Sequence, residues 1–392
     1  MRGFPEVADV FRAHGTSYRQ THEMPLRHLR AMRAIEVCRT AVLGGHVDEC
    51  DHCGSLKISY NSCRNRHCPK CQCLDKERWL EARKRDLVPV KYFHVVFTLP
   101  EPLRPLVLRN QKLLYQILFR ASSETLKELT RDPKHLGADI GFISLLHTWS
   151  QTLMDHPHLH CIVTAGGLSP DGKRWIPCKE DFFLPAKVLS RLFRGKFLAY
   201  LKNAYDKGQI AFPGQIAHLK ENHELKALLA TLYGQEWNVY CKPSFRNAET
   251  LMEYLGRYTH RVAISNDRLV KIEGDQVTFK YRDRNDNNQI KLMTLDAAEF
   301  IRRFLLHILP DGFVKIRHYG IFSTRNRKTK LTQCMALFGV RYPEQDQEKH
   351  RMPWEELLES ITGVDPRICP YCGKGRMIRK QVLNLSTLAL PP

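Results

Sequence analysis

The spacing of apolar residues predicts a helical start to the chain, followed by a region that mixes strands and helices. Over residues 4–45 apolar side chains recur at three- and four-residue intervals, which is typical of amphipathic helices, and a glycine pair at 44–45 ends the pattern. Residues 92–99 are rich in β-branched and aromatic side chains and stop at Pro100, so we expect a buried strand there.

Two helices are expected next, a long amphipathic one over residues 106–129 and another over residues 140–154. After Pro157 the apolar run 159–163 predicts a second short buried strand, which the glycine pair at 166–167 terminates. The order strand, helix, helix, strand indicates an α+β fold and argues against a parallel doubly wound sheet.

The rest of the chain continues this mixture. Helices are predicted over residues 184–205, 223–232 and 295–309, and strands over residues 237–241, 262–265, 269–273, 276–282 and 289–294. A charged helix over residues 74–86 leads to Pro89, where we place the first boundary. The expected parts are therefore residues 1–88, residues 89–335 and a C-terminal tail of residues 336–392.

The charge balance adds a partner to this picture. The chain carries 61 Lys and Arg against 41 Asp and Glu, a formal charge of +20, which favours a polyanionic partner, nucleic acid above all. No run of 18 apolar residues exists and the N-terminus has no apolar signal core, so we expect no membrane partner and an intracellular location. In that setting the 13 cysteines point to metal ligation before disulfides.

Two Cys-x2-Cys pairs early in the chain predict a structural zinc site. The expected ligands are Cys50, Cys53, Cys68 and Cys71. Four further residues close in sequence leave open a swapped ligand or a second ion: His52, Cys63, His67 and Cys73. Arg64 and Arg66 lie between the pairs and are expected to contact DNA phosphates. A third pair, Cys369 and Cys372, has no partner in sequence; it either recruits Cys334 or a histidine, pairs across the chain, or forms a turn without metal.

His158 and His160 are two apart on the second predicted strand, so both imidazoles project from one face while Leu159 points into the core. Such a pair makes a half-site for a divalent metal with open coordination positions, although a lone His-x-His is more often a pair of ordinary polar residues. The third ligand is left open among His94, His147, His156 and His260.

Tyr254 and Tyr258 are four residues apart, so on a helix both phenols share one face. A tyrosine pair at this spacing is usually part of a core, but Arg257 and Arg261 make this face cationic. Residues 315–330 add six Lys or Arg, Arg317 and Arg325 among them, with aromatic residues between the charges and no acid; a solvated loop and a surface for single-stranded DNA both fit this pattern.

Together these residues form a set suited to cutting DNA covalently. A divalent ion offsets charge on the scissile phosphate, and a tyrosine hydroxyl attacks phosphorus to leave a 5′-phosphotyrosine and a free 3′-hydroxyl. A second tyrosine allows a second strand to be attached while the first is held. The order in which the two tyrosines act is left open.

The motifs resemble those of a known superfamily. His158-Leu-His160 resembles the His-hydrophobe-His signature of HUH endonucleases, and Tyr254-Leu-Gly-Arg-Tyr258 resembles their two-tyrosine motif. Residues 95–100, Val-Val-Phe-Thr-Leu-Pro, resemble the first motif of rolling-circle replication initiators. With the cysteine pairs and the segments 61–72, 300–307 and 316–320, the chain from about residue 20 to 375 is similar to the rolling-circle transposases of the insertion-sequence 91 family.

This resemblance implies a palm of antiparallel sheet flanked by helices, preceded by a helical zinc-binding domain. It also implies Mg²⁺ or Mn²⁺ at the nuclease site, structural Zn²⁺, single-stranded or hairpin DNA at the ends of a mobile element, and a cytoplasmic, nucleoid-associated location in a bacterium. Two alternatives use the same residues differently: a replication initiator or relaxase with the same chemistry, and a zinc-containing DNA-binding protein without catalysis.

Overall fold

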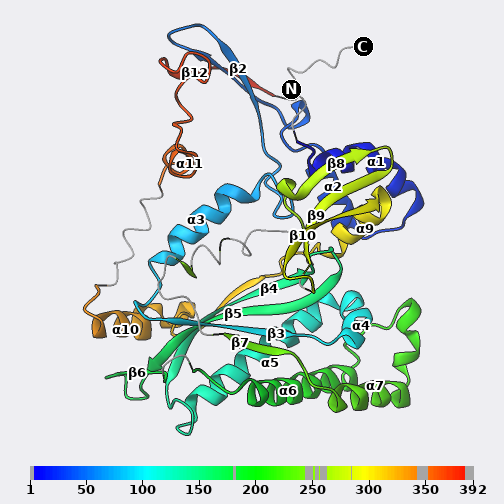
Figure 1. Cartoon of the computed structure of the whole chain (residues 1–392), viewed down its shortest axis with the longest axis vertical. Helices are drawn as coiled ribbons and strands as arrows, with labels where there is room; N and C mark the ends of the chain where they lie inside the picture. Colours follow the sequence, from blue (N-terminus) through cyan, green and yellow to red (C-terminus); the bar gives the residue numbers. More distant parts are fainter. Residues whose placement is uncertain are drawn as a thin grey trace.

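The computed structural model describes residues 4–179, 182–242, 250–251, 256, 263–283, 285–341 and 352–384, with the side chains of residues 72–75 left aside. Within these ranges the strands form three sheets, and every strand pairing is antiparallel. Helices cover these sheets, so the expected α+β class with antiparallel sheets is confirmed (Figure 1).

The largest sheet lies in the middle of the chain. Its strand order is β11 (Ile316–Gly320), β4 (Asp139–Trp149), β5 (Asp155–Leu168), β3 (Tyr92–Thr98) and β7 (Val239–Lys242), with β6 (Trp175–Pro177) added at the far end of β5. β5 is longer than the expected strand because it continues through both glycines at 166–167.

The expected helix over residues 140–154 is wrong, because these residues form β4 and the turn after it. Residues 140–146 are all buried, since β4 lies between two neighbouring strands and is covered on both faces. A strand buried on both faces has no polar alternation, so its apolar run cannot be told from a buried helix by pattern alone.

A layer of helices covers one face of the large sheet (Figure 1). It consists of α4 (Arg104–Arg109), α5 (Gln111–Arg131), α6 (Ala186–Asp206) and α7 (Asn222–Gly234). Leu159, Cys161 and Val163 of β5 are fully buried in the core between this layer and the sheet. The single helix expected over residues 106–129 is divided at Asn110, whose side-chain amide donates to the carbonyl oxygens of Leu106 and Ala211.

The opposite face of the large sheet is covered by α3 (Gln72–Lys84) and α10 (Thr332–Leu337). Leu80 of α3, Ile143 of β4 and Ile162 of β5 belong to one buried cluster on this side. Leu251, one of the few described residues between 243 and 262, is buried in the same cluster.

The N-terminal helices share their core with a later part of the chain. α1 (Val7–Thr21) and α2 (Leu26–Glu36) pack with α9 (Ala297–Leu306) and with the sheet of β8 (Leu269–Glu273), β9 (Gln276–Asp283) and β10 (Gln289–Asp296). The rings of Phe11 and Phe304 meet edge to face with centroids 5.3 Å apart. Of the strand expected over residues 262–265, residue 262 lies outside the described residues and residues 263–265 are irregular.

The third sheet, at the top of Figure 1, pairs an early segment of the chain with a late one. β12 (Met377–Leu383) pairs with β1 (Gly45–Cys50), which pairs with β2 (Leu56–Tyr60). α11 (Trp354–Thr362) precedes β12 and lies against α3. Short 3-10 turns cover Ala41–Leu43, Glu101–Leu103, Gly214–Lys220, Asn266–Arg268 and Thr324–Asn326, and a π turn covers Arg327–Leu331.

Among the described residues, every helix is too short or too polar to cross a membrane.

Candidate active site and metal centres

Three histidines from two neighbouring strands of the large sheet form one cluster. His147 of β4 lies directly opposite His158 of β5, and His160 follows two residues along β5 on the same face. His158 Nε2 is 3.1 Å from His147 Nδ1 and 3.1 Å from His160 Nε2. The antiparallel register of β4 and β5 therefore brings the three ring nitrogens together.

The ring orientations of the β5 histidines are held by their other nitrogens. His158 Nδ1 is 2.6 Å from the carbonyl oxygen of His156, so Nδ1 carries the proton and Nε2 directs its lone pair into the cluster. His160 Nδ1 is 2.9 Å from Nε2 of His94 on the neighbouring strand β3. A metal-binding histidine usually donates its second ring N–H to a carboxylate, a backbone carbonyl or water, and His158 has such a carbonyl partner.

Burial favours the neutral imidazole at His147 of the cluster and at the neighbouring His94. Desolvation, followed by the charges of His158 and His160, lowers the pKa of His147 well below its ordinary value of 6.5. Burial, followed by the charge of Lys242, lowers the pKa of His94 to about 4. A neutral imidazole is the form that binds a metal, so proton competition at His147 is weak at neutral pH.

The three ring nitrogens fit a divalent ion. The ligand atoms of His147, His158 and His160 all lie within 4.8 Å of one another. Two ligands at about 2.1 Å from one octahedral ion and at right angles to each other lie about 3.0 Å apart, close to the 3.1 Å observed for both pairs that include His158. The cluster could therefore hold a divalent ion through three imidazole nitrogens.

Of the four histidines expected as third-ligand candidates, His147 is the one that the cluster contains. His94 touches His160 from the neighbouring strand, and His156 contributes its carbonyl oxygen. His260 lies outside the described residues. Sequence reasoning could not single out His147, because it assigned this residue to a helix and so missed its place opposite His158.

Tyr254, Tyr258, Arg257 and Arg261 lie outside the described residues. Two residues near the tyrosines in the sequence are described: Leu251, on the histidine face of the large sheet, and Gly256, close to the helix α3 that covers this face. Leu251 is fully buried with Ile143 and Ile162. A Cβ added to Gly256 would lie 3.0 Å from Leu80 Cδ1, so Gly256 approaches α3 closely. The predicted catalytic role of the tyrosines stays a prediction.

Eight of the described cysteines form two separate clusters, and the structure corrects the expected grouping. Instead of closing one site together, the two early pairs are divided between clusters. The first cluster, the core cluster, contains Cys38, Cys63, Cys68 and Cys71. The second, the end cluster, contains Cys50, Cys53, Cys369 and Cys372. The single site was expected from the spacing of the cysteines in the sequence. That spacing does not show that β12 pairs with β1.

The core cluster lies where α2 ends and α3 begins. Cys71 Sγ is 3.5 Å from Cys38 Sγ and 3.6 Å from Cys63 Sγ. Sulfurs bound to one tetrahedral zinc at about 2.3 Å lie about 3.8 Å apart, whereas a disulfide bond is about 2.05 Å long. The distances between the sulfurs therefore suit a zinc site with four thiolate ligands. Cys63, which the sequence left open as an alternative ligand, belongs to this cluster.

The histidines near these cysteines lie outside both clusters. His67 Nε2 accepts a hydrogen bond from the backbone N–H of Leu309 at 3.2 Å. Burial, followed by the charge of Arg66, lowers the pKa of His67 to about 3, so it is the neutral acceptor that this bond needs. This hydrogen bond therefore joins the segment that carries the core cluster to the loop after α9. Cys73 has no described side chain.

The arginines expected to contact DNA have different surroundings. Arg66 donates to the carbonyl oxygens of Phe313 and Pro310 at 2.7 and 3.0 Å, so its guanidinium holds a loop of the protein. Arg317 stacks over Phe119 of α5, on the face of the large sheet opposite the histidines. Arg64 and Arg325 are exposed. Their predicted DNA contacts stay predictions.

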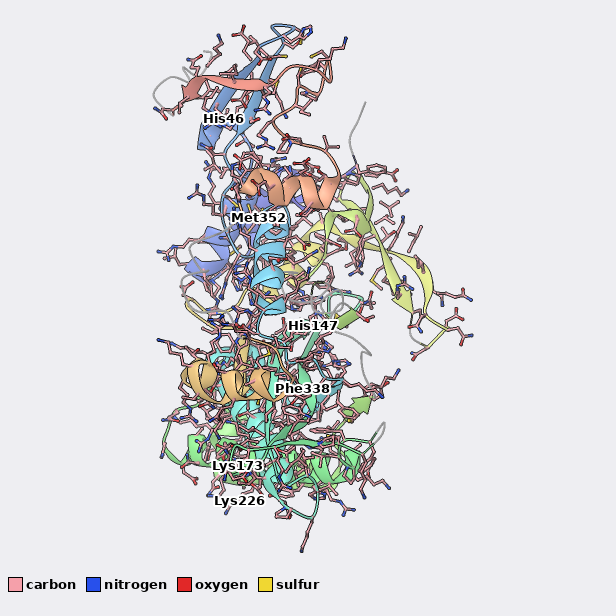
Figure 2. The ribbon with its side chains drawn as sticks, turned by 90° about the vertical axis from the view of Figure 1, so that its left-hand side faces the viewer. His46, His147, Lys173, Lys226, Phe338 and Met352 are labelled. Carbon is pink, nitrogen blue, oxygen red and sulfur yellow. The ribbon has the colours of Figure 1, made fainter. Side chains whose placement is uncertain are left out.

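The three-histidine cluster and the end cluster lie far apart in the molecule. His46 marks the sheet of β1, β2 and β12 at one end of the long axis, while His147 lies nearer the middle (Figure 2). The helix α3 occupies the space between them (Figure 1).

Comparison with known proteins matches both an N-terminal region and the middle of the chain to transposases. Residues 141–330 match a family described as "Putative transposase", and residues 10–99 match one described as "Transposase zinc-binding domain". The chain is 49% identical over 98% of its length, and 96% of the relative's, to "Putative transposase y4qJ" of Sinorhizobium fredii. It is 28% identical over 90% of its length, and 83% of the relative's, to the transposase for insertion sequence element IS801 of Pseudomonas savastanoi pv. phaseolicola. No solved structure matches the chain.

Proposed function

Because the chain belongs to the insertion-sequence 91 family of transposases, we propose that it nicks and rejoins single-stranded DNA at the ends of its mobile element by tyrosine attack on phosphate. This chemistry would drive rolling-circle transposition. The observation that carries the proposal is the cluster of His147, His158 and His160 on one face of the sheet.

The histidines hold the divalent ion in this proposal. A bound ion supplies Lewis-acid stabilisation of the charge that develops on the phosphate oxygens. His158 is oriented by the carbonyl of His156, and His160 by His94, so the ligand geometry is set before DNA binds. Of the two ions expected, three imidazole donors favour Mn²⁺ over Mg²⁺, because Mg²⁺ prefers oxygen ligands.

The tyrosines act as the nucleophiles. The hydroxyl oxygen of Tyr254 or Tyr258 loses its proton and attacks phosphorus, and the bond from phosphorus to the 3′-oxygen breaks. The 3′-oxygen takes a proton and leaves as a free hydroxyl, while the 5′-phosphate stays on the tyrosine. Rejoining is the reverse reaction, in which a 3′-hydroxyl attacks the phosphotyrosine. The burial of Leu251 on the histidine face and the approach of Gly256 to α3 support this assignment.

The DNA substrate follows from the charge and from the family. A formal charge of +20 favours phosphate binding, and a tyrosine nuclease of this type acts on single strands or hairpins at the element ends, within the bacterial nucleoid. The chain's match to a transposase zinc-binding domain favours this function over a replication initiator with the same chemistry.

The test is a cleavage assay with single-stranded oligonucleotides from the element ends in Mn²⁺ or Mg²⁺. The wild-type protein should form a covalent 5′ adduct that Tyr254→Phe with Tyr258→Phe abolishes, and that His160→Ala reduces at least 100-fold. Tyr233→Phe, an exposed tyrosine on α7, is the matched control and should leave the adduct unchanged. Binding of the same oligonucleotides without any adduct, or an adduct that survives the double substitution, would refute the tyrosine mechanism.

A further inference from the structure

The C-terminal pair Cys369 and Cys372 meets the pair Cys50 and Cys53, although 316 residues separate Cys53 from Cys369. We propose that these four cysteines, the end cluster, bind a second structural zinc ion that joins the turn after β1 to the turn before β12. The match to the zinc-binding family ends at residue 99, so half of this site comes from outside the recognised domain.

The sulfur positions are those of a tetrahedral metal site. Cys50 Sγ lies 3.7 Å from Cys372 Sγ, and Cys53 Sγ lies 3.7 Å from Cys369 Sγ. All four sulfurs are within 4.8 Å of one another. Sulfurs bound to one zinc at about 2.3 Å lie about 3.8 Å apart, so both measured pairs have the separation that a shared ion requires.

The two halves of the end cluster repeat one local structure. In each half a glycine follows the second cysteine and has a positive φ, 71° at Gly54 and 67° at Gly373. Each of these glycines donates its N–H to the carbonyl oxygen of the first cysteine of its own pair.

Backbone N–H groups also point at the sulfurs of both halves. His52 N donates to Cys50 Sγ at 3.4 Å, and Tyr371 N donates to Cys369 Sγ at the same distance. Such bonds favour thiolate over thiol, and thiolate is the form that binds zinc. The repeat therefore presents two matched pairs of cysteine sulfurs to one point.

The backbone between the halves is organised for this contact. β12 pairs with β1 up to Cys50, opposite Met377, and the backbone of Arg376 exchanges hydrogen bonds with Asp51. A Cβ at Gly375 would lie 2.5 Å from Cys50 Sγ, so only glycine lets the C-terminal turn come this close without displacement. Two buried thiols, Cys50 and Cys369, are 2% and 1% exposed, so the ion would be shielded from solvent on one side.

This zinc would place α11 as well as β12. α11 lies between the large sheet and the C-terminal half of the end cluster in sequence, and it packs on α3, with Leu357 buried. Because β12 is the last strand among the described residues and its sheet has three strands, the metal would add a fixed point to the pairing of β12 with β1.

The experiment is a zinc count on the purified full-length protein by inductively coupled plasma mass spectrometry. Wild type should contain two zinc ions per chain, and Cys369→Ser with Cys372→Ser should contain one. The matched control, Cys178→Ser with Cys241→Ser, removes two cysteines that lie outside both clusters and should keep two ions. Two ions in the Cys369/Cys372 variant, or one in wild type, would overturn the proposal.

A second measurement on wild type avoids dependence on the variant's folding. Cys369 and Cys372 should resist alkylation until a zinc chelator is added, and then react together with Cys50 and Cys53. Protection that persists with chelator and disappears with a reductant would mean disulfides, and reaction without chelator would mean free thiols. Either result excludes the second zinc.

Discussion

Asp155 begins the strand that carries His158 and His160, and its carboxyl group is buried at 4% exposure. Neither oxygen has a hydrogen-bond partner among the described residues. Burial raises the pKa of Asp155 to about 7 from 3.8, with Arg104 opposing the shift. The folded protein therefore holds this group as the neutral acid over a pH range in which the unfolded chain ionises it.

The sign of the pH effect follows from these two values. Because folding raises the pKa of Asp155, its protonated form makes its full contribution to the free energy of unfolding below about pH 3.8. This contribution is lost as the pH rises to about 7. A shift of about three pKa units corresponds to about 4 kcal/mol. Asp155→Asn keeps the shape of the neutral acid and cannot ionise, so it should remove this loss.

The assay is urea unfolding of wild type and Asp155→Asn at pH 5 and pH 8, with zinc present. The advantage of the variant should be larger at pH 8 than at pH 5 by about 3 kcal/mol, since about two pKa units of the window lie between these values. Asp206→Asn, at an exposed carboxylate on α6, is the control and should show the same small difference at both pH values. An Asp155→Asn effect that is independent of pH would refute the reasoning.

Two further predictions concern the histidine cluster and the sheet that carries it. His147→Ala should weaken Mn²⁺ binding about 10- to 100-fold, measured by calorimetry, because it removes one of three clustered nitrogens. His318→Ala, at a half-buried histidine on β11, is the control. Equal affinity in wild type and His147→Ala would exclude His147 as a ligand. Gly320→Ala should lower the melting temperature more than Gly274→Ala, although both glycines have a positive φ, 61° and 52°. The reason is that a Cβ at Gly320 would lie 1.7 Å from the carbonyl oxygen of Ile140, whereas a Cβ at Gly274 would meet no atom within 4 Å. Equal losses would show that only the φ angle matters.

The elements that sequence pattern predicted well are those with one exposed face or a clear stop. α9 has apolar residues along one side only, and β3 ends just before Pro100, so periodicity and a breaker residue identified both. β4 was misassigned because its burial on both faces removes the alternation on which the prediction depends. The tail strand β12 was not expected, since its residues gain a strand's environment only by pairing with β1.

The metal sites show the same limit at the level of single residues. His158 and His160 could be paired from sequence because a strand fixes the relation of residues two apart. His147 joins them only through the register of β4 against β5, and Cys369 joins Cys53 across 316 residues. Local spacing gives the ligand types and half of each site, whereas long-range strand pairing decides which halves meet.

The helix α3 explains how separate motifs in the sequence can serve one function. Cys71 of the core cluster is its N-cap residue, so a zinc bound there would fix the start of the helix. Leu80, further along, packs on the histidine face of the large sheet and also touches Gly256, between the two predicted tyrosines. α11, just before the end cluster, rests on the same helix. The segment that carries the core cluster would therefore set the position of the helix against which Leu251, Gly256 and the histidine strand pack.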